Sequence, residues 1–88
     1  MDYTLVIARD AWGCPIKRFV VGRAQNCVYL ANPARIRAVE SGESSPIGVP
    51  TEDVFTYEEQ AFRVLERQWV RDGRIDQGVW KGLIPYSA

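Results

Sequence analysis

The residue types that most often perform catalysis are sparse in this sequence. It contains no histidine, the commonest general base and a frequent metal ligand, and this excludes Ser-His-Asp and Cys-His arrangements within the chain. Its two cysteines, Cys14 and Cys27, lie thirteen positions apart, whereas a structural zinc site needs four Cys or His ligands at close paired spacing. We therefore expect a non-enzymatic protein, with no catalytic residue, no metal ligand and no cofactor-binding residue.

Two groups of residues remain as candidates for chemistry, and for both a structural role is favoured. Cys14 follows a glycine in an expected loop, where Arg9 or Lys17 would lower the pKa of the thiol, but an unreactive thiol packed beside Trp12 is the favoured interpretation. Six acidic side chains lie within residues 40–59, without the alternating spacing and glycine of a calcium loop. A solvating or helix-capping use of these acids is favoured over a site.

Charge is balanced overall but unevenly distributed along the chain. Eleven basic and eleven acidic residues give a net charge of zero, which argues against a non-specific polyanion binder. Residues 1–37 nevertheless carry six basic and two acidic side chains, and residues 38–60 carry six acidic and no basic ones. Nine of the eleven bases are arginine, which favours contact surfaces because its guanidinium pairs in a bidentate way and stacks on rings.

Apolar runs and turn residues divide the chain into short elements. A continuous run of β-forming residues at 3–8 predicts a strand buried on both faces, and two further strands at 16–21 and 27–31 predict an antiparallel hairpin. The pair Asn32-Pro33 favours the start of a short helix over 33–40, followed by a long loop over 41–55. An apolar tail, 74–88, closes the chain.

The longest predicted element is a helix over 57–72. Thr56 and Glu59 have the spacing of a capping box, and an apolar stripe follows, formed by Tyr57, Ala61, Phe62, Leu65 and Trp69. We therefore expect a single α+β domain over 1–88, in which a small antiparallel three-stranded sheet of β-β-β-α-α order is packed by one long C-terminal amphipathic helix.

These features predict a small protein–protein interaction or homo-oligomeric protein. Trp and Arg are enriched at binding hot spots, and the expected interaction surface comprises Arg9, Trp12, Arg18, Arg23 and Trp80. The expected partner is a protein or a second copy of the chain, with a homodimer favoured over a monomer because one sheet face needs a cover. The alternative is a nucleic-acid-associated regulatory protein that uses the basic half of the sheet. No apolar run approaches membrane-spanning length and no secretion signal is evident, so we expect a cytoplasmic protein with reduced thiols.

Overall fold

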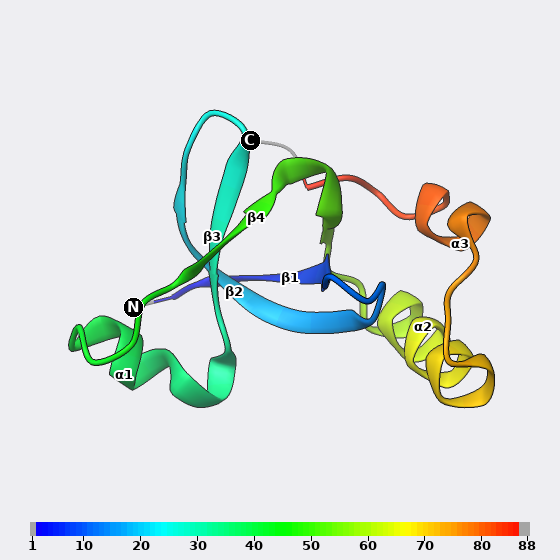
Figure 1. The fold of residues 1–88 in the computed structure, drawn as a ribbon, viewed down its shortest axis with the longest axis horizontal. Coiled ribbons are helices and arrows are strands. Elements are labelled where there is room, and N and C mark those ends of the chain that lie inside the picture. The colour runs from blue at the N-terminus through cyan, green and yellow to red at the C-terminus, as the bar shows by residue number, and fades with distance from the viewer. Residues whose placement is uncertain (1, 87–88) are drawn as a thin grey trace.

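The computed structural model describes residues 2–86 as a five-stranded antiparallel sheet with helices beside it (Figure 1). In chain order the elements are β1 (Thr4–Arg9), β2 (Pro15–Arg23), β3 (Cys27–Ala31), the 3-10 helix η1 (Pro33–Arg35), α1 (Ile36–Glu40), β4 (Ile47–Pro50), the 3-10 helix η2 (Thr51–Asp53), β5 (Val54–Thr56), α2 (Glu59–Asp72) and α3 (Gln77–Lys81). In the view of Figure 1, α1 lies at one end of the molecule, and α2 and α3 lie at the other.

The sheet curls back on itself. Its strand order is β4-β3-β2-β1-β5, so β4 and β5 lie at opposite edges although only the three residues of η2 separate them in the chain. A connection this short requires the two edges to approach one another, which makes the sheet a partly closed barrel with a concave inner face and a convex outer face. A bulge between Val20 and Gly22 helps to bend β2, because an extra residue increases the local twist.

The two faces carry separate apolar clusters. The inner face is formed by side chains that alternate along the strands, with the fully buried cluster Val6, Ala8, Val28, Leu30 and Val54. The outer face at β1 and β5 carries Ile7 and Phe55, which pack against Phe62 and Leu65 of α2 and Trp80 of α3. Val6, Ile7 and Ala8 have no exposed surface, so the prediction of a strand buried on both faces is confirmed for β1.

The prediction of a three-stranded sheet is wrong, whereas its antiparallel hairpin is confirmed in β2 and β3. The segment expected to be a long loop, 41–55, contains β4, η2 and the greater part of β5. Both strands are short, and each acquires its hydrogen-bonding partner from a distant strand: β4 pairs with β3 and β5 pairs with β1. Local sequence alone does not signal pairing of this kind.

The helix expected over 57–72 forms, but it begins later than predicted. Its N-cap is Glu58, whose carboxylate accepts hydrogen bonds from the backbone N–H groups of Gln60 and Ala61. Thr56 is unavailable as a cap because it pairs with Val6 as the last residue of β5. On the apolar stripe Phe62 and Leu65 are buried, as expected, whereas Trp69 stays partly exposed. The region expected to be a helix over 33–40 divides into η1 and α1, with Asn32 capping η1 as predicted.

The part of the apolar tail that the structure describes, 74–86, packs against both faces of the sheet, and residues 87–88 lie outside the described residues. Thr56 N–H donates to the carbonyl of Ile84, and Tyr86 N–H donates to the carbonyl of Val54, so the tail runs alongside β5. Trp80 stacks on Phe55 with ring centroids 5.2 Å apart on the outer face, and Tyr86 packs against the inner cluster. The free edge of β5 is therefore covered from within the chain. No helix in residues 2–86 has the length and apolar character needed to cross a membrane.

Candidate functional site

A cavity of about 590 Å³ opens on the inner face, between the β1–β2 connection and the segment that joins β3 to β4. Its walls are largely apolar, and the apolar side chains that matter below are Trp12, Ile16, Leu30, Ile47 and Val49. We call this cavity, with its charged neighbours Arg9, Asp10, Arg18, Arg35 and Asp53, the Trp12 pocket. A volume of this size is in the range of ordinary ligand sites, which are concave and mostly apolar with a few polar groups.

The first rim of the pocket is the β1–β2 connection, which is a firmly fixed turn. The carboxylate of Asp10 accepts hydrogen bonds from the backbone N–H groups of Trp12 and Cys14, both at 2.9 Å. Gly13 has a φ of 80°, a left-handed conformation that glycine adopts without strain, and its N–H donates to the carbonyl of Asp10. This turn presents Trp12 with 82% of its surface exposed. The backbone of the turn is therefore fixed at the position from which the indole projects.

The second rim is the start of β4. Ile47 lies opposite Leu30 in the β3–β4 pairing and is on the same face of the sheet, yet it is 69% exposed because no other element of residues 2–86 covers it. Val49, the next residue on that face, is partly buried and packs against the inner cluster. The apolar surface therefore continues from the core outward to Ile47.

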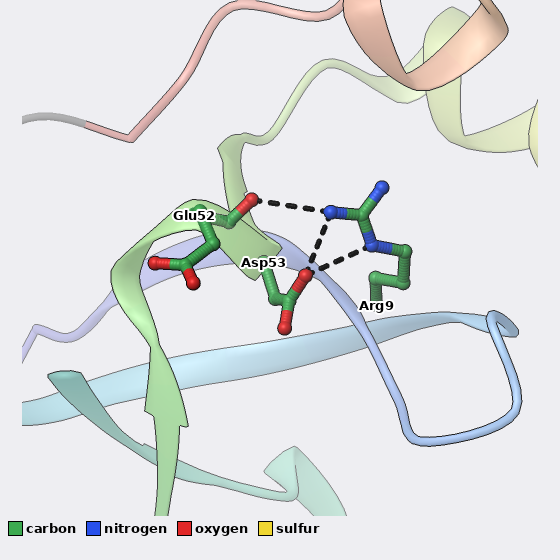
Figure 2. A network of polar contacts seen from close by, with 3 residues as sticks. All are labelled: Arg9, Glu52 and Asp53. Atoms are coloured by element: carbon green, nitrogen blue, oxygen red, sulfur yellow. Dashed lines mark hydrogen bonds and ion pairs between the residues drawn. The ribbon is translucent and has the colours of Figure 1, made fainter. Parts of the chain in front are cut away.

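Two residues that line the pocket, Arg9 and Asp53, form an ion pair (Figure 2). The guanidinium of Arg9, from β1, donates through Nε and Nη2 to Oδ1 of Asp53 in η2, at 2.9 and 2.7 Å. Nη2 also lies 3.3 Å from the carbonyl oxygen of Glu52. On its other side Arg9 lies 5.5 Å from the ring centroid of Phe55 and 5.0 Å from that of Trp80. Arg9 therefore joins the pocket to the packed outer face, and its charge is matched within the chain.

Two other arginines line the pocket without such a partner. Arg18 lies opposite Val6 on β2, on the inner face, and its Nη1 donates to the carbonyl of Lys17 at 2.8 Å. Arg35 ends η1 and is exposed. Neither guanidinium has a carboxylate within 4.0 Å among the side chains of residues 2–86. The pocket therefore combines an apolar interior with two unpaired positive charges.

The structure gathers some of the predicted surface residues and separates others. Arg9, Trp12 and Arg18 all line the Trp12 pocket. Arg23 lies away from it, at the end of β2, with its guanidinium 5.4 Å from the ring centroid of Tyr86. Trp80 is only 3% exposed and belongs to the outer-face core, so it offers no contact surface. Its burial depends on Phe55 and β5, which the sequence did not predict.

Several pocket residues were missed by sequence reasoning. Ile47 and Asp53 were placed in a long loop, and Arg35 in a helix with no assigned role. A signal for β4 was present, because Ile47 and Val49 alternate with Gly48 and are flanked by Pro46 and Pro50, a pattern compatible with an edge strand. No local signal marks Asp53 as the partner of Arg9, which lies 44 residues away.

Cys14 and the acidic side chains of residues 40–59 were the candidates for chemistry. The pKa of the Cys14 thiol, beside the Trp12 turn, is raised by burial and then by the negative charge of Asp10, which opposes thiolate formation at neutral pH. Among residues 2–86 no three Cys, Asp or Glu side chains gather closely enough to hold a metal ion.

Comparisons of the chain with known protein families, curated proteins and solved structures find no match.

Proposed function

We propose that this protein is a small non-enzymatic binding domain that receives a short apolar segment of a partner protein in the Trp12 pocket. One observation carries the proposal: two large apolar side chains, Trp12 and Ile47, are exposed on the rims of a single cavity. Isolated exposed apolar residues are ordinary on protein surfaces, but their convergence around a cavity is typical of a binding site. Tryptophan is also one of the residues enriched at binding hot spots, which cluster near the centres of protein interfaces.

The form of the β4 edge favours the pocket over strand addition as the mode of binding. Thr51 N–H donates to the carbonyl of Asn26 in the β3–β4 pairing, and N–H groups alternate in direction along a strand. The positions facing away from β3 are therefore Pro46, Gly48 and Pro50. Two of these three lack an N–H, so the edge offers a partner strand a poor hydrogen-bonding template.

Self-association remains the other protein-binding possibility. The sequence favoured a homodimer because one sheet face needed a cover. The tail supplies much of that cover, since Trp80 and Leu83 pack on the outer cluster and Tyr86 on the inner one. A partner segment in the pocket therefore has better support than a second copy of the chain. Light scattering at two concentrations tenfold apart distinguishes the two, because a dimer has twice the monomer mass and a weak dimer also loses mass on dilution.

Nucleic-acid binding through the basic half of the sheet has less support. Three of the bases expected to serve it have contacts within the chain: Arg9 with Asp53, Lys17 over the rings of Tyr57 and Phe62, and Arg23 over that of Tyr86. Binding of a short oligonucleotide that weakens steeply with added salt would favour this alternative, because counterion release sets the salt dependence.

The test is selection from a library of displayed random dodecapeptides, followed by mapping of the bound peptide with backbone amide NMR shifts. We expect enrichment on the wild type and shifts concentrated at residues 10–18 and 47–50. The double variant Trp12→Ala/Ile47→Ser should lose binding at least tenfold. Val70→Ser is the matched control, since Val70 is 83% exposed on α2, outside the pocket, and should bind normally.

Two results contradict the proposal. One is a selection in which the wild type enriches no peptide beyond the Trp12→Ala/Ile47→Ser variant. The other is a set of bound peptides whose shifts map to α2 or to the outer face of the sheet, which would move the binding surface elsewhere.

A further inference from the structure

The charges around the Trp12 pocket are unequally matched within the chain. Asp53 is engaged by Arg9, and the carboxylate of Asp10 accepts two backbone N–H groups of its own turn. Asp53 is therefore ion-paired, whereas Asp10 has hydrogen-bond partners but keeps its negative charge, so the three arginines and two acids of the pocket have a net charge of +1. Arg18 and Arg35 have no carboxylate within 4.0 Å among residues 2–86. The positive charge that remains free in the pocket is thus located on these two arginines.

The apolar surroundings of Arg18 should strengthen its attraction for a bound carboxylate. Its neighbours on the same face of β2 are Ile16 and Val20, which pack against the inner cluster, and it lies opposite the fully buried Val6. The side chain is itself partly buried. A guanidinium has five N–H donors, and the described hydrogen bond to the carbonyl of Lys17 uses one nitrogen. A carboxylate bound here would pair with a charge whose surroundings are apolar, where water screens the attraction less than on an open surface.

We propose that the partner segment is acidic, and that a side-chain carboxylate next to its apolar anchor binds Arg18 and Arg35. This inference rests on the proposed function and specifies the chemistry of the segment. The apolar anchor would contact Trp12, Leu30 and Ile47, while the carboxylate would lie across the pocket on the two guanidinium groups. Arginine is suited to this role because its planar donors match a carboxylate in a bidentate geometry.

The surroundings of the pocket favour a short acidic peptide over a nucleic acid. Residues 38–60, which supply part of the pocket wall, carry six acids and no base. A polyphosphate strand extending beyond the two arginines would therefore meet repulsion from this acidic segment. A peptide with one or two carboxylates beside an apolar residue can place its charges locally and avoid it.

The experiment uses the peptides selected on the wild-type protein, synthesised with an acetylated N-terminus and an amidated C-terminus so that side chains supply the only carboxylates. Each is compared with a copy in which Asp and Glu are replaced by Asn and Gln. We expect selected sequences to be enriched in acids beside the apolar anchor, and the amide copies to bind the wild type at least tenfold more weakly.

The protein variants complete a double-mutant cycle. Arg18→Gln/Arg35→Gln should bind the acidic peptide and its amide copy with equal affinity, whereas Arg67→Gln, on the exposed side of α2, should preserve the tenfold preference. Circular dichroism checks that each variant is folded. If Arg18→Gln unfolds the protein, the exposed Arg35→Glu provides the test, since it should invert the preference toward a peptide with Lys in place of the acid.

The outcomes separate the inference from the function on which it rests. If acidic and amide peptides bind the wild type equally while Trp12→Ala/Ile47→Ser abolishes binding, the pocket recognises apolar groups alone and the inference is wrong. If a free C-terminal carboxylate is required in place of side-chain acids, the inference is also wrong in its choice of group. If a short oligonucleotide displaces the peptide from the wild type but not from the arginine variant, the site binds phosphates instead. Absence of any peptide binding overturns the proposed function itself.

Discussion

The outer face at β5 and the Trp12 pocket contain similar residues in opposite states. On the outer face Trp80, Leu65 and Phe55 are at most 7% exposed, because α2 and α3 cover them. In the pocket Trp12 and Ile47 are 82% and 69% exposed, although they lie beside an equally well-packed inner cluster. The outer face is a core that the helices cover completely, and we call it the finished core. In the pocket, the apolar surface continues beyond the inner cluster to side chains that nothing in residues 2–86 covers.

The difference between the two regions is fixed by backbone geometry. Trp12 lies on a turn whose backbone is fixed by hydrogen bonds to Asp10 and by a left-handed Gly13, and its indole is exposed there. Trp80, by contrast, lies on a short helix that packs directly on Phe55. Arg9 lies at the boundary, since it lines the pocket and also contacts the rings of Phe55 and Trp80. The Arg9 side chain thus lies between the buried apolar residues of the outer face and the exposed apolar residues of the pocket.

The largest effect is expected in the finished core. Leu65→Ala should lower the free energy of unfolding by about 2–5 kcal/mol, because it removes a side chain that is 1% exposed and leaves a cavity between α2 and the sheet. Such a loss is a large fraction of the stability of a small domain. Urea denaturation followed by circular dichroism measures it. Val64→Ala, at the neighbouring position on the exposed side of α2, should cost about 0.5 kcal/mol or less.

A loss at Leu65 no greater than that at Val64 would mean that α2 does not cover the outer face. The distinction between a finished core and an open pocket would then disappear.

An intermediate effect is expected at the boundary. Arg9→Met should cost about 1–2 kcal/mol, because it removes charge-assisted hydrogen bonds to Asp53 and a cation–π contact while keeping an unbranched apolar stem. A cycle with Asp53→Asn isolates the pair. The matched control is Arg71–Asp72, an ion pair with a similar separation of 2.8 Å but a greater exposure to solvent, for which coupling should be close to zero.

Equal coupling energies in the two pairs, both unaffected by salt, would show that partial burial adds nothing to the Arg9–Asp53 interaction. In that case Arg9 would not connect the pocket to the core.

The parts of this fold that could be predicted are those whose signal is local. The buried strand β1 was predicted from its continuous apolar run, the β2–β3 hairpin from two short runs joined by turn residues, and α2 from its helical periodicity. The missed strands are three or four residues long, and β4 contains Gly48 and Pro50, so the alternation of Ile47 and Val49 is too short to distinguish an edge strand from a loop. The error in the predicted start of α2 has the same cause. Thr56 was assigned as the N-cap because β5, which contains it, was not predicted.

The candidate site could be predicted only in part, for the same reason. Trp12 and Arg18 were identified by residue type, and both belong to the pocket. The opposite wall is provided by Ile47, which reaches that position only because β4 pairs with β3. Residue type also placed Trp80 on the expected surface, although the pairing of β5 with β1 produces the apolar site that buries it. Exposure of a tryptophan is therefore a property of tertiary structure.

The smallest effect on stability is expected in the pocket, and it is the sharpest test of the comparison. Trp12→Ala should change the free energy of unfolding by about 0.5 kcal/mol or less, since the indole is mostly in contact with water and the turn is held by backbone hydrogen bonds that the substitution retains. Trp80→Ala removes the same side chain from the finished core and should cost about 3–5 kcal/mol. Circular dichroism is the appropriate readout, because either substitution alters the fluorescence of the protein. A cost at Trp12 approaching that at Trp80 would mean that the indole closes the inner core, which would remove the main support for a binding pocket. A near-zero cost at Trp12, together with loss of peptide binding by the single variant Trp12→Ala, would assign the indole to recognition, because the loss of binding could not then be explained by loss of folding.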